Sequence, residues 1–447
     1  MADAVLIYPY FYKHAKDTSI FKFPPLGLGY IASALRNKGF SVDLIDGTFT
    51  DPDTVVERTL AADPVVVGYY VMITMEHAAF ELAGRLNGGS RLQVAGGPYP
   101  SATPERFLHV FDITCIGEGE NTMPELMTAV IEGNDPKGIR GLAYGDNGTV
   151  TRTAPRDRIT DIDALSTPAR DLFDDTAYKD YWQGHYGYTV TSMITSRGCP
   201  YHCGFCSKPV FGDACIGRSA SGIVDEMEGI AASGYDRIWI ADDCFTLDKK
   251  RMGKVCDLMR DRGLNITWEC LSRVDGIDLV TLKSMHDAGC DRVFFGLESG
   301  SDEMLKKMKK GTDVAAGSRA VGLSLESGLK TGGFFILGYP GETNDTLIKT
   351  VNYSSHLGLD YLSYTVPYPI PGTDLYEKVA PVLNDEEWTS PKRHKLLYRS
   401  HFSILKLKAA MAKGLIQNWL KRHLMKPGAI METAFRYVSD RIIRLIP

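Results

Sequence analysis

Short apolar runs alternate with longer, helix-like segments throughout the first 135 residues of the chain. Within most runs consecutive residues are apolar and do not alternate strictly with polar ones, as is typical of strands that are buried on both faces of a parallel sheet. The segments between the runs are long enough to cross from one strand to the next as single helices. We therefore predict a doubly wound sheet with strands at residues 5–8, 41–46, 65–69, 92–95 and 113–116.

Three loops that leave these predicted strands are rich in glycine and other small residues. They are Asp46-Gly47-Thr48, Gly96-Gly97-Pro98 and Gly117-Glu118-Gly119-Glu120. On a flavodoxin-like sheet of this kind, ligands bind beyond the carboxyl ends of the strands. The loops that contain Gly96, Gly97, Gly117 and Gly119 are therefore candidate ligand-binding loops.

The alternation stops at about residue 138 and resumes at residue 188. The segment between contains turn-forming residues and mixed charge, which predicts a hairpin followed by a connector. The second βα series has six predicted strands, too few for an eight-fold barrel, and indicates a partial (β/α)6 barrel with its site at the strand C-termini. These strands are at residues 189–195, 237–241, 265–270, 292–297, 331–337 and 361–366.

The last part of the chain is strongly basic. Residues 390–447 contain 13 Lys or Arg and two acidic residues, a formal charge of +11 that leaves −16 for the other residues of a chain of net charge −5. Apolar residues recur at near-helical spacing among the lysines, from Ile404 to Leu420. Such a helix suits an anionic membrane surface, and it suits equally a lid that packs on the barrel with its lysines in solvent.

The pattern divides this α/β protein into four parts. They are a doubly wound domain at residues 1–137, a linker at 138–187, a partial barrel at 188–374 and a helical C-terminal region at 375–447. The 447 residues are long enough for several domains, and 44% hydrophobic and 23% charged residues are ordinary for a globular chain. The modest net charge gives no reason to expect nucleic acid as a partner.

The chain contains nine cysteines, and the chemistry expected of them depends on the cellular compartment. The first residues lack the basic region of a signal peptide, and no apolar stretch is long enough to span a bilayer. We therefore predict a cytoplasmic protein, in which clustered cysteines are more often metal ligands or catalytic groups than disulfides.

Three cysteines form a cluster in the segment Ser196-Arg197-Gly198-Cys199-Pro200-Tyr201-His202-Cys203-Gly204-Phe205-Cys206. Three thiolates at CxxxCxxC spacing, on the loop after the first barrel strand, can hold three irons of a cubane [4Fe–4S] cluster and leave the fourth iron open. A structural zinc site would need a fourth ligand, and His202 is badly placed to provide it.

This motif resembles that of the radical S-adenosylmethionine superfamily, over about residues 188–373. The resemblance implies that Cys199, Cys203 and Cys206 bind the cluster and that its open iron chelates the methionine moiety of S-adenosylmethionine. One electron would then cleave the S–C5′ bond and give a 5′-deoxyadenosyl radical. Phe205 would pack near the adenine.

The resemblance also implies cofactor contacts at the ends of other barrel strands. Glu298 would bind the ribose or the amino group, Arg273 and Ser272 would suit the carboxylate, and Gly338 begins a stretch that would flank the adenine. Asp242 and Asp243 end the second strand but depart from the family's Gly-Gly-Glu pattern, so their contact stays open. Each of these residues could instead be a solvated cap or turn. Cys215 and Cys244 lie near the predicted mouth, and no catalytic residue is assigned.

The domain before the barrel resembles that of the cobalamin-binding class of the same superfamily. Its loops at Gly96-Gly97 and Gly117–Gly119 look like those that line the corrin and its nucleotide tail. The Asp-x-His-x-x-Gly motif, which supplies a lower His ligand, is absent, since Tyr8-Pro9-Tyr10 follows the first strand. Some members of the class have lost cobalamin, so a domain that binds only a substrate or a partner is the alternative.

The resemblance implies a cobalamin-dependent enzyme that methylates an unactivated carbon of a hydrophobic or secondary-metabolite substrate. One alternative is a cobalamin-free or cyclising enzyme of lipid or tetrapyrrole biosynthesis. Another is a non-catalytic iron–sulfur electron carrier or scaffold. The expected partners are a small-molecule substrate and a reductant such as flavodoxin or ferredoxin. Membrane contact through the basic C-terminal segment is a further expectation, and such contact would favour a lipid-like substrate.

Overall fold

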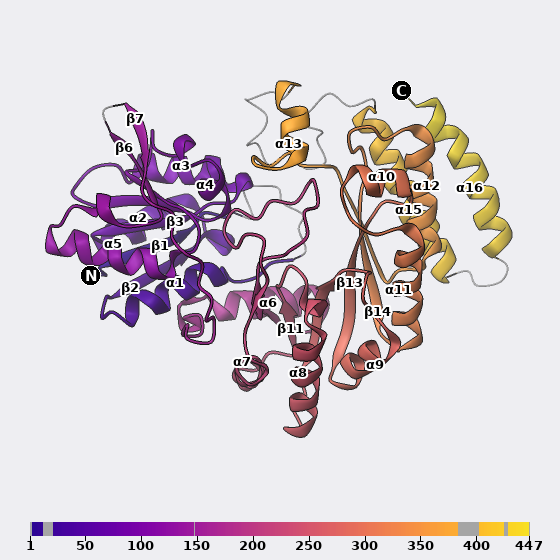
Figure 1. The fold of residues 1–447 in the computed structure, drawn as a ribbon, viewed down its shortest axis with the longest axis horizontal. Helices are drawn as coiled ribbons and strands as arrows, with labels where there is room; N and C mark the ends of the chain where they lie inside the picture. The colour runs from indigo at the N-terminus through magenta and orange to yellow at the C-terminus, as the bar shows by residue number, and fades with distance from the viewer. Residues whose placement is uncertain (1, 12–20, 147, 383–401, 424–427, 447) are drawn as a thin grey trace. The chain divides into compact units, whose positions relative to one another are not determined.

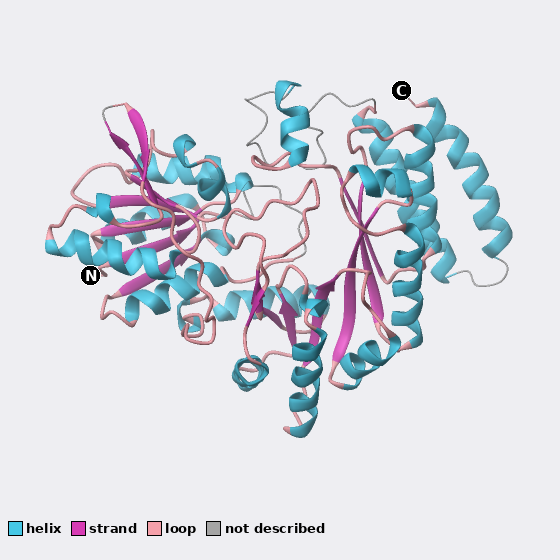
Figure 2. Ribbon diagram, viewed as in Figure 1, coloured by secondary structure: helices cyan, strands magenta, loops and turns pink. Residues whose placement is uncertain are grey.

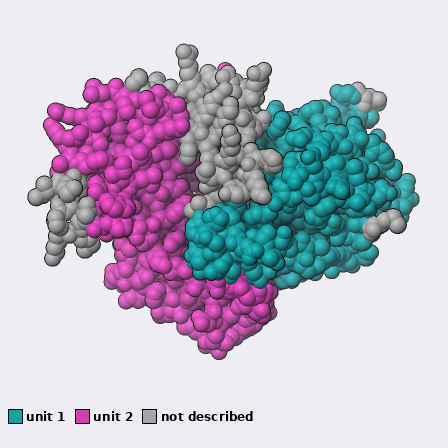
Figure 3. Space-filling view, turned by 180° about the vertical axis from the view of Figure 1, so that it is seen from behind, with its two compact units in different colours: residues 1–199, 208–218, 385–391 teal, residues 200–207, 219–384, 392–447 magenta. Residues whose placement is uncertain are grey.

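The computed structural model describes residues 2–11, 21–146, 148–382, 402–423 and 428–446. These form two compact units, coloured differently in Figure 3. Unit 1 includes residues 1–199 and 208–218, and unit 2 includes residues 200–207, 219–384 and 392–447.

Unit 1 is built on a seven-stranded sheet of order β2-β1-β3-β4-β5-β6-β7. The first five strands are parallel, and β6 and β7 form the predicted hairpin, which pairs antiparallel with β5. The strands are β1 (Ala4–Tyr8), β2 (Val42–Asp46), β3 (Val66–Tyr70), β4 (Leu92–Gly96), β5 (Ile113–Cys115), β6 (Leu142–Asp146) and β7 (Thr149–Arg152). The order 2-1-3-4-5 is that of a flavodoxin-like doubly wound sheet, as predicted.

Helices cover both faces of this sheet (Figure 2). Alternate residues of β1 serve the two faces, since Leu6 packs with α1 (Leu26–Arg36) and α5 (Gly119–Glu132), while Val5 and Ile7 pack with the opposite layer. That layer consists of α2 (Pro52–Ala62) and α3 (Glu76–Arg85), and the short α4 (Pro98–Ala102) follows β4. Burial of β1 on both sides accounts for its uninterrupted apolar sequence.

Unit 1 also contains a helix in the segment predicted as a connector, α6 (Asp175–Tyr186). Asp174 caps its first turn by accepting a hydrogen bond from the Ala177 backbone N–H. One turn apart, Tyr178 donates a hydrogen bond of 2.6 Å to Asp46 and Trp182 donates one of 2.8 Å to the Lys22 carbonyl. Because most of the helix is polar, only these two aromatic residues are buried, and the apolar periodicity is too weak to predict it.

Unit 2 contains five parallel strands in sequential order, β11-β12-β13-β14-β15. They are β11 (Arg237–Ile240), β12 (Thr267–Ser272), β13 (Cys290–Glu298), β14 (Lys330–Ile336) and β15 (Tyr361–Thr365). The first strand of the predicted series, β8 (Val190–Met193), and the pair β9 (Ser196–Arg197) and β10 (Ile216–Gly217) belong to unit 1. Sequential order distinguishes a barrel-type βα series from the doubly wound sheet of unit 1.

Helices connect the strands of unit 2 (Figure 1). They are α7 (Ala220–Ala232), α8 (Lys249–Asp261), α9 (Leu279–Asp287), α10 (Asp302–Lys307), α11 (Val314–Glu326), α12 (Asn344–His356) and α13 (Asp374–Val379). Val293 and Phe295 of β13 are fully buried, and between them Phe294 stacks on Phe334 of the neighbouring β14 at a ring distance of 5.7 Å.

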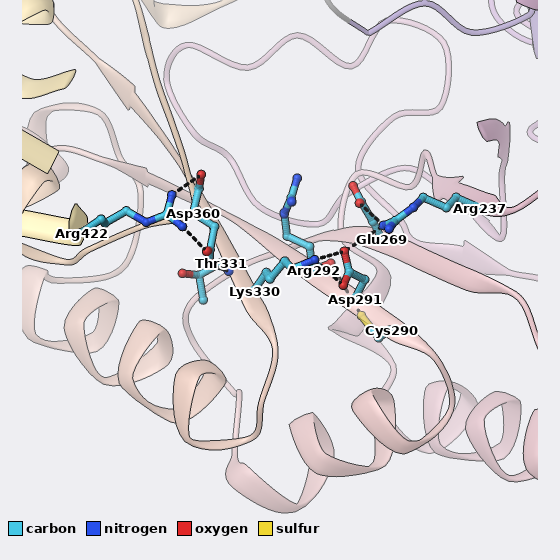
Figure 4. Close-up of polar contacts among 9 residues, drawn as sticks. All are labelled: Arg237, Glu269, Cys290, Asp291, Arg292, Lys330, Thr331, Asp360 and Arg422. Atoms are coloured by element: carbon cyan, nitrogen blue, oxygen red, sulfur yellow. Dashed lines mark hydrogen bonds and ion pairs between the residues drawn. The ribbon is translucent and has the colours of Figure 1, made fainter. Parts of the chain in front are cut away.

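The edge at which these strands begin is held by ion pairs (Figure 4). Arg237 lies 2.8 Å from Asp291 and 3.3 Å from Glu269, and Lys330 lies 2.9 Å from Asp291. Asp360, just before β15, pairs with Arg422 at 2.8 Å. This edge is opposite the strand C-termini, so its charges contribute to stability and not to the candidate site.

Two helices follow the barrel-type series, α15 (Ile404–His423) and α16 (Gly428–Leu445). Both pack against α12 and against each other (Figure 1). The predicted helical C-terminus is thus confirmed, although Lys406 and Lys413 are buried, where a lid was expected to keep its lysines in solvent. Among the helices that the structure describes, none combines the length and the apolar character needed to cross a membrane.

Candidate functional site

The three motif cysteines are divided between the units. Cys199 ends the first stretch of unit 1, whereas Cys203 and Cys206 belong to unit 2. The side chains of all three are partly or fully exposed. In the part of the chain that the structure describes, no three His, Cys, Asp or Glu residues lie together as ligands of a single metal ion. The assignment of the three cysteines to one cluster therefore stays a prediction.

The loop that carries Cys203 and Cys206 is fixed by backbone hydrogen bonds within unit 2. The Gly204 N–H donates to the Met308 carbonyl and the Gly204 carbonyl accepts from the Leu375 N–H, both at 2.8 Å. Phe205 packs against a buried apolar cluster that includes Met308, Leu375 and Tyr339. Tyr339 directly follows Gly338, so two residues predicted to flank the adenine, Phe205 and Gly338, lie in one neighbourhood.

Arg273 is the residue after β12 and contacts this loop directly. Its Nη1 lies 3.9 Å from the Cys203 Sγ, and its guanidinium stacks 3.6 Å from the centre of the Tyr201 ring. Nε donates to Asp275 and Nη2 to the Lys310 carbonyl, both at 2.8 Å. Because every branch of the guanidinium is engaged, a positive charge is held at a defined position beside the Cys203 thiol.

Glu298, the last residue of β13, pairs with Lys310 in the same neighbourhood. Its Oε1 lies 2.7 Å from the Lys310 Nζ, and both side chains are buried. Burial acts to lower the pKa of Lys310, but the nearby Glu298 and Cys203 outweigh it and raise that pKa, so Lys310 carries its positive charge. Glu298 has a φ of 61°, in the left-handed region that residues other than glycine adopt uncommonly. Such strained positions are frequent at functional sites.

The other predicted contacts at these strand ends have partners of their own. Ser272 Oγ lies 2.6 Å from Thr246 Oγ1 and donates to the Arg273 carbonyl. The Asp242 carboxylate is buried 4.0 Å from Arg251, whereas Asp243 is exposed. Ser272 thus supports Arg273 through its backbone.

Gly338 has a φ of 88°, and its N–H donates to Glu342. Burial raises the pKa of the Glu342 carboxyl to about 8, against the effect of this hydrogen bond. At neutral pH that carboxyl is therefore mostly neutral, and it braces the turn after β14.

The sequence analysis missed Lys310, which links Arg273 to Glu298. It ends the basic run Lys306-Lys307-Met308-Lys309-Lys310, in which Lys307 and Lys309 form more exposed ion pairs. Such a run is normally a solvated face, so only the fold distinguishes the one buried lysine. Tyr201 was part of the cysteine motif, but nothing in the sequence paired its ring with Arg273.

In unit 1 the glycine-rich loops follow β4 and β5, as predicted. Gly96 ends β4, and Gly97 has a φ of 100° and lies so close to Val71 that a Cβ atom would come within 3.1 Å of its backbone N. Gly117 has a φ of 81° and open space around it, and its N–H donates to Ser101 at 3.0 Å. Gly119 begins α5 and packs against Ile31. At Gly97 and Gly117 these loops present backbone in place of a side chain.

The two glutamates of the second loop are engaged by one arginine of the cysteine motif. Arg197 lies 2.7 Å from Glu118 and 2.6 Å from Glu120, and all three side chains are at least nine-tenths buried. The guanidinium also stacks on Tyr30 at 5.1 Å. Burial acts to lower the pKa of Arg197, but the two carboxylates outweigh it and raise that pKa.

The residues that follow Arg197 are tightly constrained. Gly198 has a φ of 84°, and a Cβ atom there would lie only 2.8 Å from the Phe211 carbonyl oxygen. The Cys199 carbonyl accepts a hydrogen bond of 2.7 Å from Lys208. Arg197 and Gly198 together fix the backbone that leads into Cys199.

Of the two cysteines predicted near the mouth, Cys244 is buried and lies 3.8 Å from Thr246, and Cys215 is partly exposed. Neither the contact of Cys244 nor the partial exposure of Cys215 indicates a catalytic role, so neither cysteine is assigned as a catalytic residue.

Comparison with known proteins finds two family models that match the chain. One, described as the radical SAM superfamily, matches residues 193–353. The other, described as a B12 binding domain, matches residues 14–127. The first match contains the three motif cysteines and strands β11 to β14 of unit 2, and the second contains strands β2 to β5 of unit 1 and the first part of α5.

Individual relatives extend over most of the chain. It is 32% identical to the uncharacterized methyltransferase PH0819 of Pyrococcus horikoshii, over 92% of this chain and 93% of that protein. It is 27% identical to the anaerobic magnesium-protoporphyrin IX monomethyl ester cyclase of Rubrivivax gelatinosus, over 80% of this chain and 66% of that protein.

Among solved structures, the fold is similar to that of the radical S-adenosylmethionine methyltransferase TsrM of Kitasatospora setae, determined with cobalamin and a [4Fe–4S] cluster bound. The TM-score is 0.71 at 22% identity, over 85% of this chain and 75% of that chain.

Proposed function

This chain belongs to the radical S-adenosylmethionine enzymes that carry an N-terminal B12-binding domain, and we propose that it methylates an unactivated carbon of a small-molecule substrate. The observation that carries the proposal is the gathering of Arg273, Lys310 and Glu298 around the Cys203 loop. The family contains methyltransferases and a cyclase, and it makes this protein an enzyme and not an iron–sulfur carrier.

The residues of unit 2 fit a small zwitterionic cofactor beside a cluster. Cys203 and Cys206, with Cys199, would bind the cluster, and the cation of Arg273 beside Cys203 suits the carboxylate of S-adenosylmethionine. Glu298, held by Lys310, suits its amino or ribose group. Phe205 supplies an apolar surface for the adenine.

The loops of unit 1 fit a large cofactor that makes contacts with backbone. Around Gly117 there is open space, and Gly97 has no room for a side chain beside Val71. These features favour a corrin, which the loops at Gly97 and Gly117 would hold. When bound, the cluster with S-adenosylmethionine supplies a 5′-deoxyadenosyl radical and cobalamin supplies a methyl group.

The likeness to a cyclase keeps ring formation as the alternative reaction. A hydrophobic or secondary-metabolite substrate and a flavodoxin or ferredoxin as reductant complete the proposal. Both are inferred from the family chemistry, and the substrate-binding side chains are not assigned.

Anaerobic incubation of the reconstituted protein with S-adenosylmethionine, hydroxocobalamin and a strong reductant tests the proposal, because the reduced cobalt accepts the methyl group of S-adenosylmethionine. We expect 5′-deoxyadenosine and S-adenosylhomocysteine, measured by mass spectrometry, together with stoichiometric corrin in the purified protein. Corrin-free protein that still forms 5′-deoxyadenosine would favour the cyclising alternative. An intact cluster with neither product would contradict the proposal.

Two cysteine variants test the cluster ligands. Cys203→Ala should lose the cluster absorbance and both products, because three thiolates are the fewest that hold the cubane with one open iron. Cys256→Ala is the matched control, since this buried thiol in α8 lies outside the motif and should leave the cluster intact. A full cluster in the Cys203 variant would overturn the assignment.

A further inference from the structure

Helix α15 buries polar side chains beside Leu407 and Met411 on its inner side. The exposed fractions of Lys406, Lys413 and Gln417 are 4%, 3% and 1%. Lys406 Nζ lies 2.9 Å from the Asn344 side chain, at the start of α12, and Lys413 Nζ lies 2.8 Å from Asp440 of α16. A surface helix normally keeps its lysines in solvent and buries its large apolar residues, whereas α15 buries two lysines and leaves a group of large apolar residues exposed.

The opposite side of α15 is apolar and exposed. Leu405, Leu415, Ile416 and Trp419 have exposed fractions of 64%, 48%, 47% and 54%. They recur at spacings that bring them to one side of the helix, and we call them the α15 face. On α16 a second group of large apolar residues is exposed, namely Tyr437, Val438, Ile442 and Leu445. A cluster of large exposed side chains of this kind marks an interaction surface.

The rotation of α15 is fixed by specific polar contacts. Asn418 donates a hydrogen bond of 3.0 Å to the Leu359 carbonyl, and Arg422 pairs with Asp360 at 2.8 Å, as Figure 4 shows. Turning the apolar side inward would break these contacts and the pair of Lys413 with Asp440. Because these contacts fix the rotation of α15, the outward apolar face is built into the fold.

Charge identifies the partner that this surface fits. The exposed charged side chains that the structure describes on α15 and α16 are Lys408, Arg422, Arg441 and Arg444, all basic, and of these Arg422 pairs with Asp360 and Arg444 with Asp345. Residues 390–447 carry a formal +11, whereas the other residues carry −16. An apolar face on a basic segment is the combination that binds the headgroup region of an anionic bilayer, and no described helix crosses one.

We propose that the α15 face docks the protein on the surface of a membrane that contains anionic lipids. Apolar side chains enter the headgroup boundary, and the basic residues of α15 and α16 add electrostatic attraction that salt screens. The proposal depends on the C-terminal helices alone and holds whichever reaction the enzyme catalyses.

Co-sedimentation of the full-length protein with vesicles tests this inference. Vesicles of phosphatidylcholine with phosphatidylglycerol should bind the protein at low salt, and vesicles of phosphatidylcholine alone should bind it at least tenfold more weakly. Trp419→Ser should weaken binding about tenfold, because burial of a large apolar side chain is worth about 1.5–3 kcal/mol. Lys408→Glu should weaken binding and reduce its salt dependence.

The matched control is Val280→Ser, which removes an 80% exposed apolar side chain from α9 in the same unit. It should bind vesicles as the unchanged protein does. Equal binding of the Trp419 and Val280 variants, or no binding to anionic vesicles, would overturn the proposal. Self-association that light scattering detects and that Trp419→Ser abolishes would also overturn it, since the face would then cover a second copy of the chain. Because no step of this test measures turnover, a failure here is separate from a failure of the proposed reaction.

Discussion

The sheets of units 1 and 2 both carry candidate loops at the carboxyl ends of their parallel strands. The chemical groups that these loops present differ between the two units. In unit 1 the loops present backbone, with Gly97 packed against Val71 and open space around Gly117. The charged side chains beside these loops are paired with one another, since Arg197 forms ion pairs with both Glu118 and Glu120. In unit 2 the buried charges surround the Cys203 loop itself.

The difference matches two kinds of cofactor. A macrocycle with many amide groups is held by shape and by backbone contacts, for which glycine is suited. A small zwitterion is held by a few fixed charges of opposite sign. Variants that damage one kind of site should therefore leave binding at the other intact.

Arg197→Met should have the largest effect on stability. It leaves two buried carboxylates without their cation, which costs about 3–5 kcal/mol. Urea unfolding measures the loss. Arg140→Met removes an exposed pair with Asp157 and should cost no more than about 1 kcal/mol. Similar losses in both variants would mean that the Arg197 cluster contributes no more than a surface pair.

Lys310→Met should affect unit 2 alone. Glu298 loses the cation that holds it, and formation of 5′-deoxyadenosine should fall about 100-fold, as expected when a charge-assisted contact worth about 1.5–3 kcal/mol is lost together with the position of the carboxylate. The amount of corrin that the purified variant retains, measured by absorbance, should equal that of the unchanged protein. Lys307→Met is the control, because its pair with Glu303 is exposed. Loss of corrin in the Lys310 variant would contradict the separation of the two sites.

Gly97→Ala should show the reverse pattern. A Cβ atom at a φ of 100° is strained and meets Val71, so the loop must shift and corrin affinity should fall about tenfold, for a cost near 1–2 kcal/mol. Cleavage of S-adenosylmethionine without methyl transfer should persist. Gly88→Ala has a similar φ of 119° but no neighbours, and it should retain corrin.

Glu342→Gln should have the smallest effect, visible only as a dependence on pH. Burial raises the pKa of this carboxyl to about 8 in the folded protein, above its unfolded value of 4.5. The folded state therefore holds the proton more tightly, and the stability that this group contributes falls as pH rises from about 4.5 to about 8 and levels off above that. The variant lacks this titrating proton. Between pH 6 and pH 9 its Tm should therefore rise by a few degrees relative to the Tm of the unchanged protein, at about 2–4 °C per kcal/mol. A constant difference in Tm would exclude Glu342 as the titrating group.

The strands of both sheets could be predicted because burial on both faces produces continuous apolar runs, as in β1. The cysteine motif could be predicted because its spacing is local. α6 was missed since tertiary contacts of Tyr178 and Trp182, and not periodicity, stabilise it. Lys310 was missed because its burial depends on distant residues.

The orientation of α15 illustrates the same limit. Its apolar residues predict a helix, but they fit two sides of it, and Leu407 and Met411 are buried while Leu405 and Trp419 are exposed. Only the partners of Lys413 and Arg422 determine which side faces α12.

The burial of the remaining cysteines has a practical consequence for thiol chemistry. Burial raises the pKa of Cys115 to about 12 and that of Cys256 to about 11, and Cys244, Cys270 and Cys290 are buried as well. Protonated, enclosed thiols react slowly with alkylating agents, iron and oxidants. Of nine cysteines, only the three of the motif and Cys215 are accessible. Mass mapping of alkylated protein should therefore report the state of the motif almost without background, and added iron and sulfide should meet few competing sites.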